Sequence, residues 1–318
     1  MIITKIIKFT KRKLKKILFR SSIELQQEIK GLNHKIESLR LENLYLKIMR
    51  YFDNHDKSLY LNEIKYLEKK GELDVFPYEY VKRFEDSEVF YDKIEKLNYV
   101  LHENKKLFFP IEQSIEEIKW SYVNYIENEN LLGGSYKEKN PHQYITDKFF
   151  VDKDDVILDL GSAEALFALH HVDIAKFILI VENNPLWSKA LEATFRPYTN
   201  KVKIINKNVS NFKSAESITL DEIMAEFSNE NFFVKMDLEG VEKDILQSNA
   251  LTFSKYTNIK IACATYHNDE DAQIIERILK DYGFNIEFSE GYLLFLYDDM
   301  ELKPPYFRKG ILRASKIN

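Results

Sequence analysis

The chain has 318 residues, of which 45% are hydrophobic, so it can hold one large domain with an extension or two small domains. Its single cysteine, Cys263, excludes an intrachain disulfide framework and fits a reducing compartment. No apolar run reaches the roughly 18 residues of a membrane-spanning helix, and the N-terminus lacks the pattern of a secretory signal. These features predict a cytoplasmic protein.

Positive charge is concentrated at the N-terminus. Residues 1–20 contain eight lysines and arginines and no acid, so the rest of the chain has a net charge of −13 where the whole has −5. An acidic body is unsuited to binding nucleic acid, and no nucleic-acid partner is expected. The apolar residues of 1–20 recur at roughly helical spacing, which predicts a basic amphipathic segment. Such a segment can bind an anionic membrane, here as a peripheral contact at the inner face; a solvated tail or a lead-in to the next helix is the alternative.

Residues 21–50 have the clearest periodicity and predict a coiled coil. The heptad a positions are Ser22, Ile29, Ile36 and Asn43, and the d positions are Leu25, Leu32, Leu39 and Leu46. Ile at a with Leu at d favours a parallel dimer, and a lone Asn at an a position fixes its register. Gly31 opposes the helix by about 1 kcal/mol relative to Ala. We expect a homodimer through residues 22–50; a helix packed against its own domain is the alternative.

Residues 51–130 are expected to form a mainly helical cap or dimerisation region. Helices are predicted over Leu59–Lys70, Ser87–Glu103 and Ser114–Glu129. A strand pair from Tyr99–His102 and Lys106–Phe109 is an alternative for part of this region. Gly133-Gly134 mark a linker to the last part of the chain.

In residues 131–318 short apolar runs alternate with helical patterns. The expected strands are Val156–Leu160, Phe177–Glu182, Val202–Ile205, Phe232–Met236, Ile259–Thr265, Asn285–Phe288 and Tyr292–Tyr297, and the expected helices are Glu164–His171, Pro185–Thr194, Val241–Gln247 and Glu270–Gly283. This alternation predicts a doubly wound α/β domain whose mostly parallel sheet is covered by helices on both faces, with an antiparallel pair at its end. Such folds bind ligands at the carboxyl ends of their strands.

The first candidate site follows the first of these strands. Asp159-Leu-Gly161 leads directly into a helix, and the next strand ends at Glu182, whose carboxylate can accept the ribose hydroxyls of an adenosine cofactor. No G-x-G-x-x-G is present, and the Asp159 carboxylate would repel a pyrophosphate. The loop therefore favours S-adenosylmethionine over a nicotinamide dinucleotide; an ordinary tight turn is the alternative.

Ionisable side chains also follow two later strands. Lys235, Asp237 and Glu239 alternate onto one side of a strand end, where buried charges are costly unless they pair. His267 ends the neighbouring strand and has the ordinary pKa of a general base. A structural ion pair and a structural histidine are the alternatives.

Four segments, in their order and spacing, resemble the FkbM family of methyltransferases. They are Asp159-Leu-Gly161, Ile180-Val-Glu182, Thr219-Leu-Asp221 and Lys235-Met-Asp-Leu-Glu-Gly-Val-Glu242. Further segments resemble one branch of that family, namely Pro141-His142-Gln-Tyr144, Thr194-Phe195-Arg196-Pro197-Tyr198, Tyr266-His267 and Tyr306-Phe307-Arg308-Lys309-Gly310. The likeness covers residues 130–318 and, more loosely, 70–130. It does not reach the basic start or the coiled coil.

The resemblance implies a class I methyltransferase fold, Rossmann-like with a seven-stranded sheet, the cofactor S-adenosylmethionine and, as a rule, O-methylation of sugars or polyketide-type hydroxyls. The cofactor-binding residues then expected are Asp159, Gly161, Ser162, Ala163, Glu164, Phe167, Glu182, Asn183, Asn208, Val209, His142 and Tyr144. Asp159 and Gly161–Ala163 would face the amino-acid end and Asn208 with Val209 the adenine, while His142 and Tyr144 would close over the cofactor.

For catalysis we expect Asp237 or His267 as the base, with Lys235 and Glu239 orienting the acceptor. The sequence leaves open a divalent metal on Asp237 and Glu239 and does not require one. The family usually has glycine at the position of Ala165, which puts the strength of cofactor binding in question. Two hypotheses result: a methyltransferase acting on a glycan or another hydroxyl-bearing acceptor, or a catalytically inactive coiled-coil interaction protein with a methyltransferase fold.

Overall fold

The computed structural model describes residues 2–79, 86–127, 129, 131–132, 139–227, 230–296 and 302–316. The chain divides into two compact units, one of residues 1–59 with 67–73 and one of residues 60–66 with 74–318. Among the described residues, no helix combines the length and apolar character needed to cross a membrane. The predicted linker at Gly133-Gly134 lies outside the described residues.

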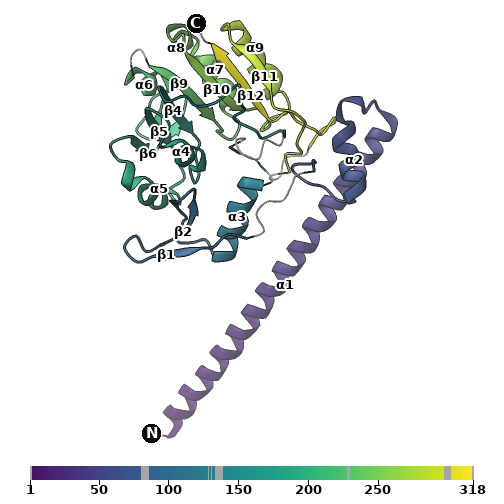
Figure 1. Ribbon diagram of the computed structural model, residues 1–318. Coiled ribbons are helices and arrows are strands. Elements are labelled where there is room, and N and C mark those ends of the chain that lie inside the picture. Colours follow the sequence, from purple (N-terminus) through teal and green to yellow (C-terminus); the bar gives the residue numbers. More distant parts are fainter. Residues whose placement is uncertain are drawn as a thin grey trace. The chain divides into compact units, whose positions relative to one another are not determined.

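The first unit is built on one long helix, α1 (Ile2–Asn54), which joins the predicted basic segment and coiled-coil segment without a break (Figure 1). Its heptad side chains are solvent-exposed, with values between 49% and 62% for Leu25, Ile29, Leu32, Ile36, Leu39 and Leu46. Further along the same helix, Ile48 and Phe52 are buried. The helix therefore has a buried apolar face near its end and a separate, uncovered apolar stripe along the predicted coiled coil.

A seven-stranded sheet forms the centre of the second unit. Its strands are β4 (Asp155–Leu160), β5 (Phe177–Val181), β6 (Val202–Ile205), β9 (Asn231–Met236), β10 (Ile259–Ala264), β11 (Asn285–Phe288) and β12 (Ile311–Lys316). They lie in the order β11-β12-β10-β9-β4-β5-β6. The pairs among β10, β9, β4, β5 and β6 are parallel, and β12 is antiparallel to both of its neighbours. This is the class I methyltransferase fold that the sequence predicted.

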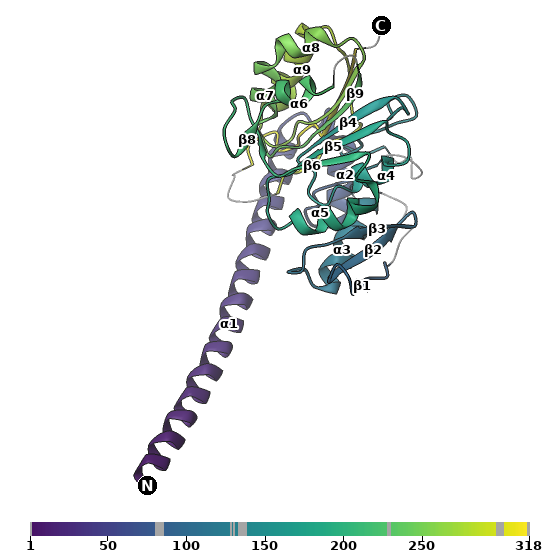
Figure 2. The ribbon, with the colours of Figure 1, turned by 90° about the vertical axis from the view of Figure 1, so that its left-hand side faces the viewer.

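Helices cover both faces of this sheet (Figure 2). They are α4 (Leu166–His171), α5 (Ser188–Phe195), α6 (Leu220–Ala225), α7 (Glu242–Ser248), α8 (Ala250–Lys255) and α9 (Asp271–Asp281). A further helix, α3 (Ile115–Glu127), lies away from this sheet. Residues of α6 to α9 form a buried apolar cluster with one face of the strands, while α4 and α5 lie on the other side (Figure 2). The remaining elements are short. The 3-10 helix Ser58–Tyr60 and α2 (Leu61–Lys70) have residues in both units. The 3-10 helix Arg196–Tyr198 and the strand pair β7 (Asn208–Val209) and β8 (Ser217–Ile218) belong to the second unit.

The helix predicted over Ser87–Glu103 is wrong. This segment contains β1 (Phe90–Asp92) and β2 (Leu97–His102), which form an antiparallel sheet with β3 (Lys105–Phe108), so the alternative strand pair is confirmed. Asp92 caps the first turn by accepting hydrogen bonds from the backbone N–H groups of Ile94 and Glu95. Burial of Leu97 and Phe108 against α5 then favours strands over the local helical pattern.

The strand predicted over Tyr292–Tyr297 is also wrong. Only Leu293 makes a bridge there, with Arg308, and Tyr297 lies outside the described residues. The seventh strand is β12 instead, which has a buried arginine, Arg313, in its centre. Its guanidinium donates to the carbonyl oxygen of Gln143 (2.7 Å) and pairs with Glu287 (3.0 Å), which offsets the cost of its burial. Because Arg313 interrupts the apolar residues of β12, their pattern in the sequence did not indicate a strand.

Candidate active site

The loop after β4 requires glycine at position 161. Gly161 has φ +71°, and a Cβ atom there would lie 1.8 Å from the carbonyl oxygen of Asp237 at the end of β9. Only glycine combines this conformation with so close an approach of two backbones. Gly161 thus brings the loop after β4 next to the polar residues that follow β9.

Glu182, immediately after β5, closes the other side of this loop. One of its carboxylate oxygens accepts a hydrogen bond from the N–H of Ala163 (2.8 Å), and the other accepts one from the N–H of Asn184 (2.7 Å). A carboxylate oxygen can accept more than one hydrogen bond, so capacity remains for ligand hydroxyls. Glu182 lines a cleft of about 810 Å³, within the size range of small-molecule sites.

The cleft continues into a smaller cavity of about 150 Å³, and Gly161, Ala163 and Asp237 line both. Of the predicted cofactor residues, the cleft is also lined by Glu182, Asn183, Asn208 and Val209, and the smaller cavity by Ser162, Glu164, Phe167 and His142. The structure thus gathers ten of the twelve predicted positions around two adjoining cavities. The other two, Asp159 and Tyr144, line neither cavity.

Asp159 lies beneath the loop, fully buried. The parallel register of β4 and β9 places it beside Lys235, whose ammonium lies 3.2 Å from its carboxylate and 2.9 Å from the carbonyl oxygen of Gly161. Lys235 also lines the small cavity. The Asp159–Lys235 ion pair therefore holds the loop after β4 in place. A structural ion pair was the alternative that the sequence left open for the charged residues of β9.

The small cavity contains buried acids that tend to be neutral. Burial raises the pKa of Glu129 to about 8 and that of Glu164 to about 7. Burial lowers the pKa of His142 to about 4. The hydroxyl of Ser162 is buried here and has no hydrogen-bond partner among the described residues. A cavity with unpaired polar groups of this kind is suited to a ligand that brings its own charges.

Asp237 is held by two tyrosines at the junction of the cavities. Its carboxylate accepts hydrogen bonds from the hydroxyls of Tyr144 (2.9 Å) and Tyr266 (3.1 Å). Burial acts to raise its pKa, but Lys235 and His267 outweigh this, and the pKa of Asp237 is lowered overall. Asp237 is therefore an ionised carboxylate of fixed orientation.

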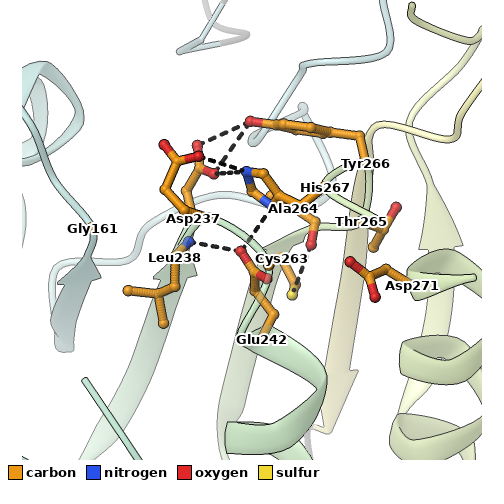
Figure 3. Close-up of polar contacts among 12 residues, drawn as sticks. Gly161, Asp237, Leu238, Glu242, Cys263, Ala264, Thr265, Tyr266, His267 and Asp271 are labelled. Atoms are coloured by element: carbon orange, nitrogen blue, oxygen red, sulfur yellow. Dashed lines mark hydrogen bonds and ion pairs between the residues drawn. The ribbon is translucent and has the colours of Figure 1, made fainter. Parts of the chain in front are cut away.

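His267 lies between carboxylates at the end of β10 (Figure 3). Its Nε2 is 3.3 Å from Asp237 Oδ1, and its Nδ1 is 3.0 Å from Glu242 Oε1. Burial acts to lower the pKa of His267, but the contacts with Glu242 and Asp237 raise it above the ordinary value. Glu239, by contrast, is 89% exposed in its side chain and lies 3.7 Å from His267 Nε2 while lining the cleft.

This arrangement bears on the metal that the sequence left open. Asp237, Glu242 and His267 offer ligand atoms within 4.8 Å of one another. The two imidazole nitrogens face different carboxylates, however, so the ring itself occupies the place of the cation between them. The three side chains therefore form a row in which the imidazole of His267 lies between the carboxylates of Asp237 and Glu242.

Sequence reasoning missed two residues of the site, Glu242 and Glu129. Glu242 is fully buried, accepts the N–H of Leu238 (2.7 Å) and orients His267. The sequence did contain a signal for Glu242, because this residue ends the Lys235–Glu242 motif. Glu129 follows α3 and lines the small cavity, a position that no local pattern indicates.

Comparison with known proteins identifies the family. Residues 119–286, more than half of the chain, match the model of the methyltransferase FkbM domain. The chain belongs to this family of methyltransferases. The family implies S-adenosylmethionine as the cofactor. No curated protein sequence matches the chain.

Solved structures of low identity also align with the chain. A precorrin-6y C5,15-methyltransferase from Geobacter metallireducens has 14% identity and a TM-score of 0.36, with 52% of this chain and 82% of that chain covered. A putative transferase from Pyrococcus horikoshii has 12% identity and a TM-score of 0.41, with 70% of this chain and 72% of that chain covered. At these scores the fold assignment rests on the strand order of the sheet itself.

The residues present fit S-adenosylmethionine. Glu182 offers carboxylate acceptors that ribose hydroxyls would require, and Asn208 and Val209 line the same cleft. The buried, unpartnered hydroxyl of Ser162 and the carboxyl groups of Glu129 and Glu164 lie where an ammonium and a carboxylate can be received. Ala165 has φ +58° and lines neither cavity, so its methyl group does not face the cofactor space.

Proposed function

We propose that the chain is an S-adenosylmethionine-dependent O-methyltransferase acting on a sugar hydroxyl of a cell-surface glycan or glycan precursor. The proposal is carried by the 3.3 Å contact between His267 and Asp237, because it puts a proton acceptor beside the residue that joins the two cavities. When bound, the cofactor supplies an electrophilic methyl group.

His267 is the proposed general base. A sugar hydroxyl is a poor nucleophile until its proton is removed, and an imidazole with a raised pKa accepts that proton more readily than Asp237, whose pKa is lowered. Glu242 holds Nδ1, so Nε2 is the nitrogen that receives the proton. Asp237 stabilises the imidazolium and, with Glu239 at the rim of the cleft, offers acceptors to the other hydroxyls of a sugar.

Binding of the methyl donor distinguishes this proposal from the alternative, a catalytically inactive interaction protein with a methyltransferase fold (the inactive scaffold). Calorimetry with S-adenosylmethionine should give micromolar affinity, and Glu182→Ala should weaken it at least about tenfold, since a hydrogen bond to a charged group contributes about 1.5–3 kcal/mol. Glu192→Ala, an exposed position of α5, is the matched control and should bind normally. Absence of binding to the folded wild-type protein would favour the scaffold.

Transfer is tested directly with the labelled donor. Radioactive methyl groups from S-adenosylmethionine should appear in the glycan fraction of cells that make the protein. They should be stable to the mild base that cleaves methyl esters. Label found only in protein, or only in base-labile form, would refute O-methylation of a sugar.

We further propose that the active form is a homodimer through residues 22–50. The exposed stripe of α1 has the a and d residues of a parallel coiled coil, and burying leucines and isoleucines of this kind contributes about 1.5–3 kcal/mol for each. Leu39→Glu should give a monomer in light scattering, whereas Ser38→Glu, exposed on the same helix, should not. A dimer that persists in Leu39→Glu would refute the assignment.

The basic residues 1–20 are proposed to bring the enzyme to an anionic membrane, which would suit a lipid-linked acceptor. Support comes from their charge and spacing, since their side chains are outside the described part of the structure. Removal of these residues should abolish flotation with anionic vesicles; unchanged flotation would contradict the proposal.

A further inference from the structure

A second group of histidine and glutamate side chains lies apart from the candidate active site. His102 ends β2, Glu103 begins the turn to β3, and His170 lies in the last turn of α4. His102 Nε2 is 3.3 Å from His170 Nδ1, Glu103 Oε2 is 3.2 Å from His170 Nδ1, and His102 Nε2 is 4.0 Å from Glu103 Oε2. None of the three lines the cleft or the small cavity.

These separations are those of ligands around a tetrahedral zinc ion. Imidazole nitrogen and carboxylate oxygen bind Zn²⁺ at about 2.0–2.2 Å, which places neighbouring ligand atoms of a tetrahedron about 3.3–3.5 Å apart. Two of the three distances agree, and the third needs a movement of about half an ångström, which the half-exposed side chain of Glu103 can make. Two histidines and one carboxylate are a ligand set that zinc uses, with a fourth position left to water.

The surroundings of His102 support this role. Its Nδ1 lies 3.1 Å from the hydroxyl of Tyr122, which holds the ring so that Nε2 faces His170. Metal-binding histidines typically have such a partner on the second nitrogen. The ammonium of Lys105 lies 3.8 Å from Glu103 Oε2 and closer to Asp173 (3.0 Å), with which it can remain paired when Glu103 binds an ion.

We propose that His102, Glu103 and His170 form a zinc site with one position open to water, which ties the β2–β3 turn to the end of α4. α4 starts directly after the loop of Gly161 to Ala165, so the ion would anchor the helix that follows the donor-binding loop. The competing arrangement contains no ion: the two imidazoles contact each other (3.3 Å), and Glu103 is held by His170 Nδ1 (3.2 Å) and by the Lys105 ammonium (3.8 Å). The zinc titration distinguishes the two arrangements.

The test uses the full-length protein after treatment with a chelator. Calorimetric titration with ZnSO₄ should give one ion per chain with sub-micromolar affinity, and zinc should raise the thermal unfolding temperature; MgCl₂ should do neither. His170→Ala should abolish binding. Glu103→Gln, on a side chain 52% exposed, should fold normally and weaken binding by at least about tenfold.

His55→Ala is the matched control, because His55 is exposed and bonded only within its own helix region to the carbonyl of Tyr51 (2.8 Å). It should bind zinc as the wild type does. Wild-type affinity retained in both His170→Ala and Glu103→Gln would overturn the site, as would failure of the wild-type protein to bind zinc. If His170→Ala does not fold, Glu103→Gln decides alone.

Discussion

The pKa shifts favour the neutral forms of ionisable groups at one end of the candidate active site and the charged forms at the other. In the small cavity, burial dominates: the pKa of Glu129 rises to about 8 and that of His142 falls to about 4, so acid and base both become neutral. At the ends of β9 and β10, pairing dominates: the pKa of Asp237 is lowered and that of His267 is raised, so the charged form of each is favoured. The two environments adjoin, because the hydroxyl of Tyr266 contacts both His142 and Asp237.

The difference indicates that the two ends of the site have different roles. Neutral buried acids are receptive to a cation, because an incoming ammonium replaces the water that burial removed. An imidazole held between carboxylates binds a proton more strongly than a free one, so its neutral form is the stronger base. The small cavity is thus suited to binding, and the His267 cluster to chemistry.

The largest expected effect tests the chemical end. His267→Ala should reduce methyl transfer by about 1,000-fold, within the range of general base catalysis, and leave the calorimetric affinity for S-adenosylmethionine within about twofold. Asp237→Asn should also reduce the rate, but less, since it removes a stabilising charge and not the base. Equal activity of His267→Ala and the wild type would remove the distinction between the two ends.

The next effect tests the binding end. Because the pKa of Glu129 is raised, the folded protein holds a proton that the unfolded chain loses above about pH 4.5, so stability falls as pH rises toward 8. Glu129→Gln removes this dependence of up to about 1.4 kcal/mol per pH unit and should stabilise the protein at pH 7.5. It should also weaken donor binding. Urea unfolding at pH 5.5 and 7.5 measures the first effect, and a wild-type pH dependence in the variant would contradict it.

The sequence could predict the sheet but not this contrast. The strands from Val156 to Thr265 were recognisable because each is a short, mainly apolar run, and Gly161 and Glu182 follow such runs directly. The state of Glu129 depends on burial by residues distant in the chain, which no local spacing encodes. Asp159 shows the same limit, since its pairing with Lys235 depends on strand register.

The elements that the sequence misjudged share one cause. In Ser87–Glu103 and in β12, tertiary partners outweigh local pattern: α5 covers Leu97, and Glu287 neutralises Arg313. Charges and helix-forming residues count against a strand until their partners are known. The helix over the heptads of α1 could be predicted because its pattern is periodic within one continuous segment and depends on no distant partner.

A smaller effect measures how His267 is tuned. Glu242→Gln removes the carboxylate at Nδ1, so the pKa of His267 should fall and the rate should drop by about tenfold. As the base must be neutral, activity in the wild type should rise with pH through a raised pKa, and in the variant this rise should move to lower pH. Folding stability changes in the opposite sense, because the contribution of a raised histidine pKa is present below about pH 6.5 and is lost above the folded value. A pH–rate profile identical to that of the wild type would exclude Glu242 as the orienting residue.

The smallest effect concerns Ala165, which begins the helix behind the small cavity. It lies in the left-handed region at φ +58°, which costs an L-residue about 1–2 kcal/mol and glycine little. Ala165→Gly should therefore stabilise the protein by about 1 kcal/mol, while Ala168→Gly, within α4, should destabilise it by at least about as much. Since Ala165 lines neither cavity, donor affinity and the pH–rate profile should not change. A gain in donor affinity without a gain in stability would instead place this methyl group against the ligand and extend the binding end of the site into α4.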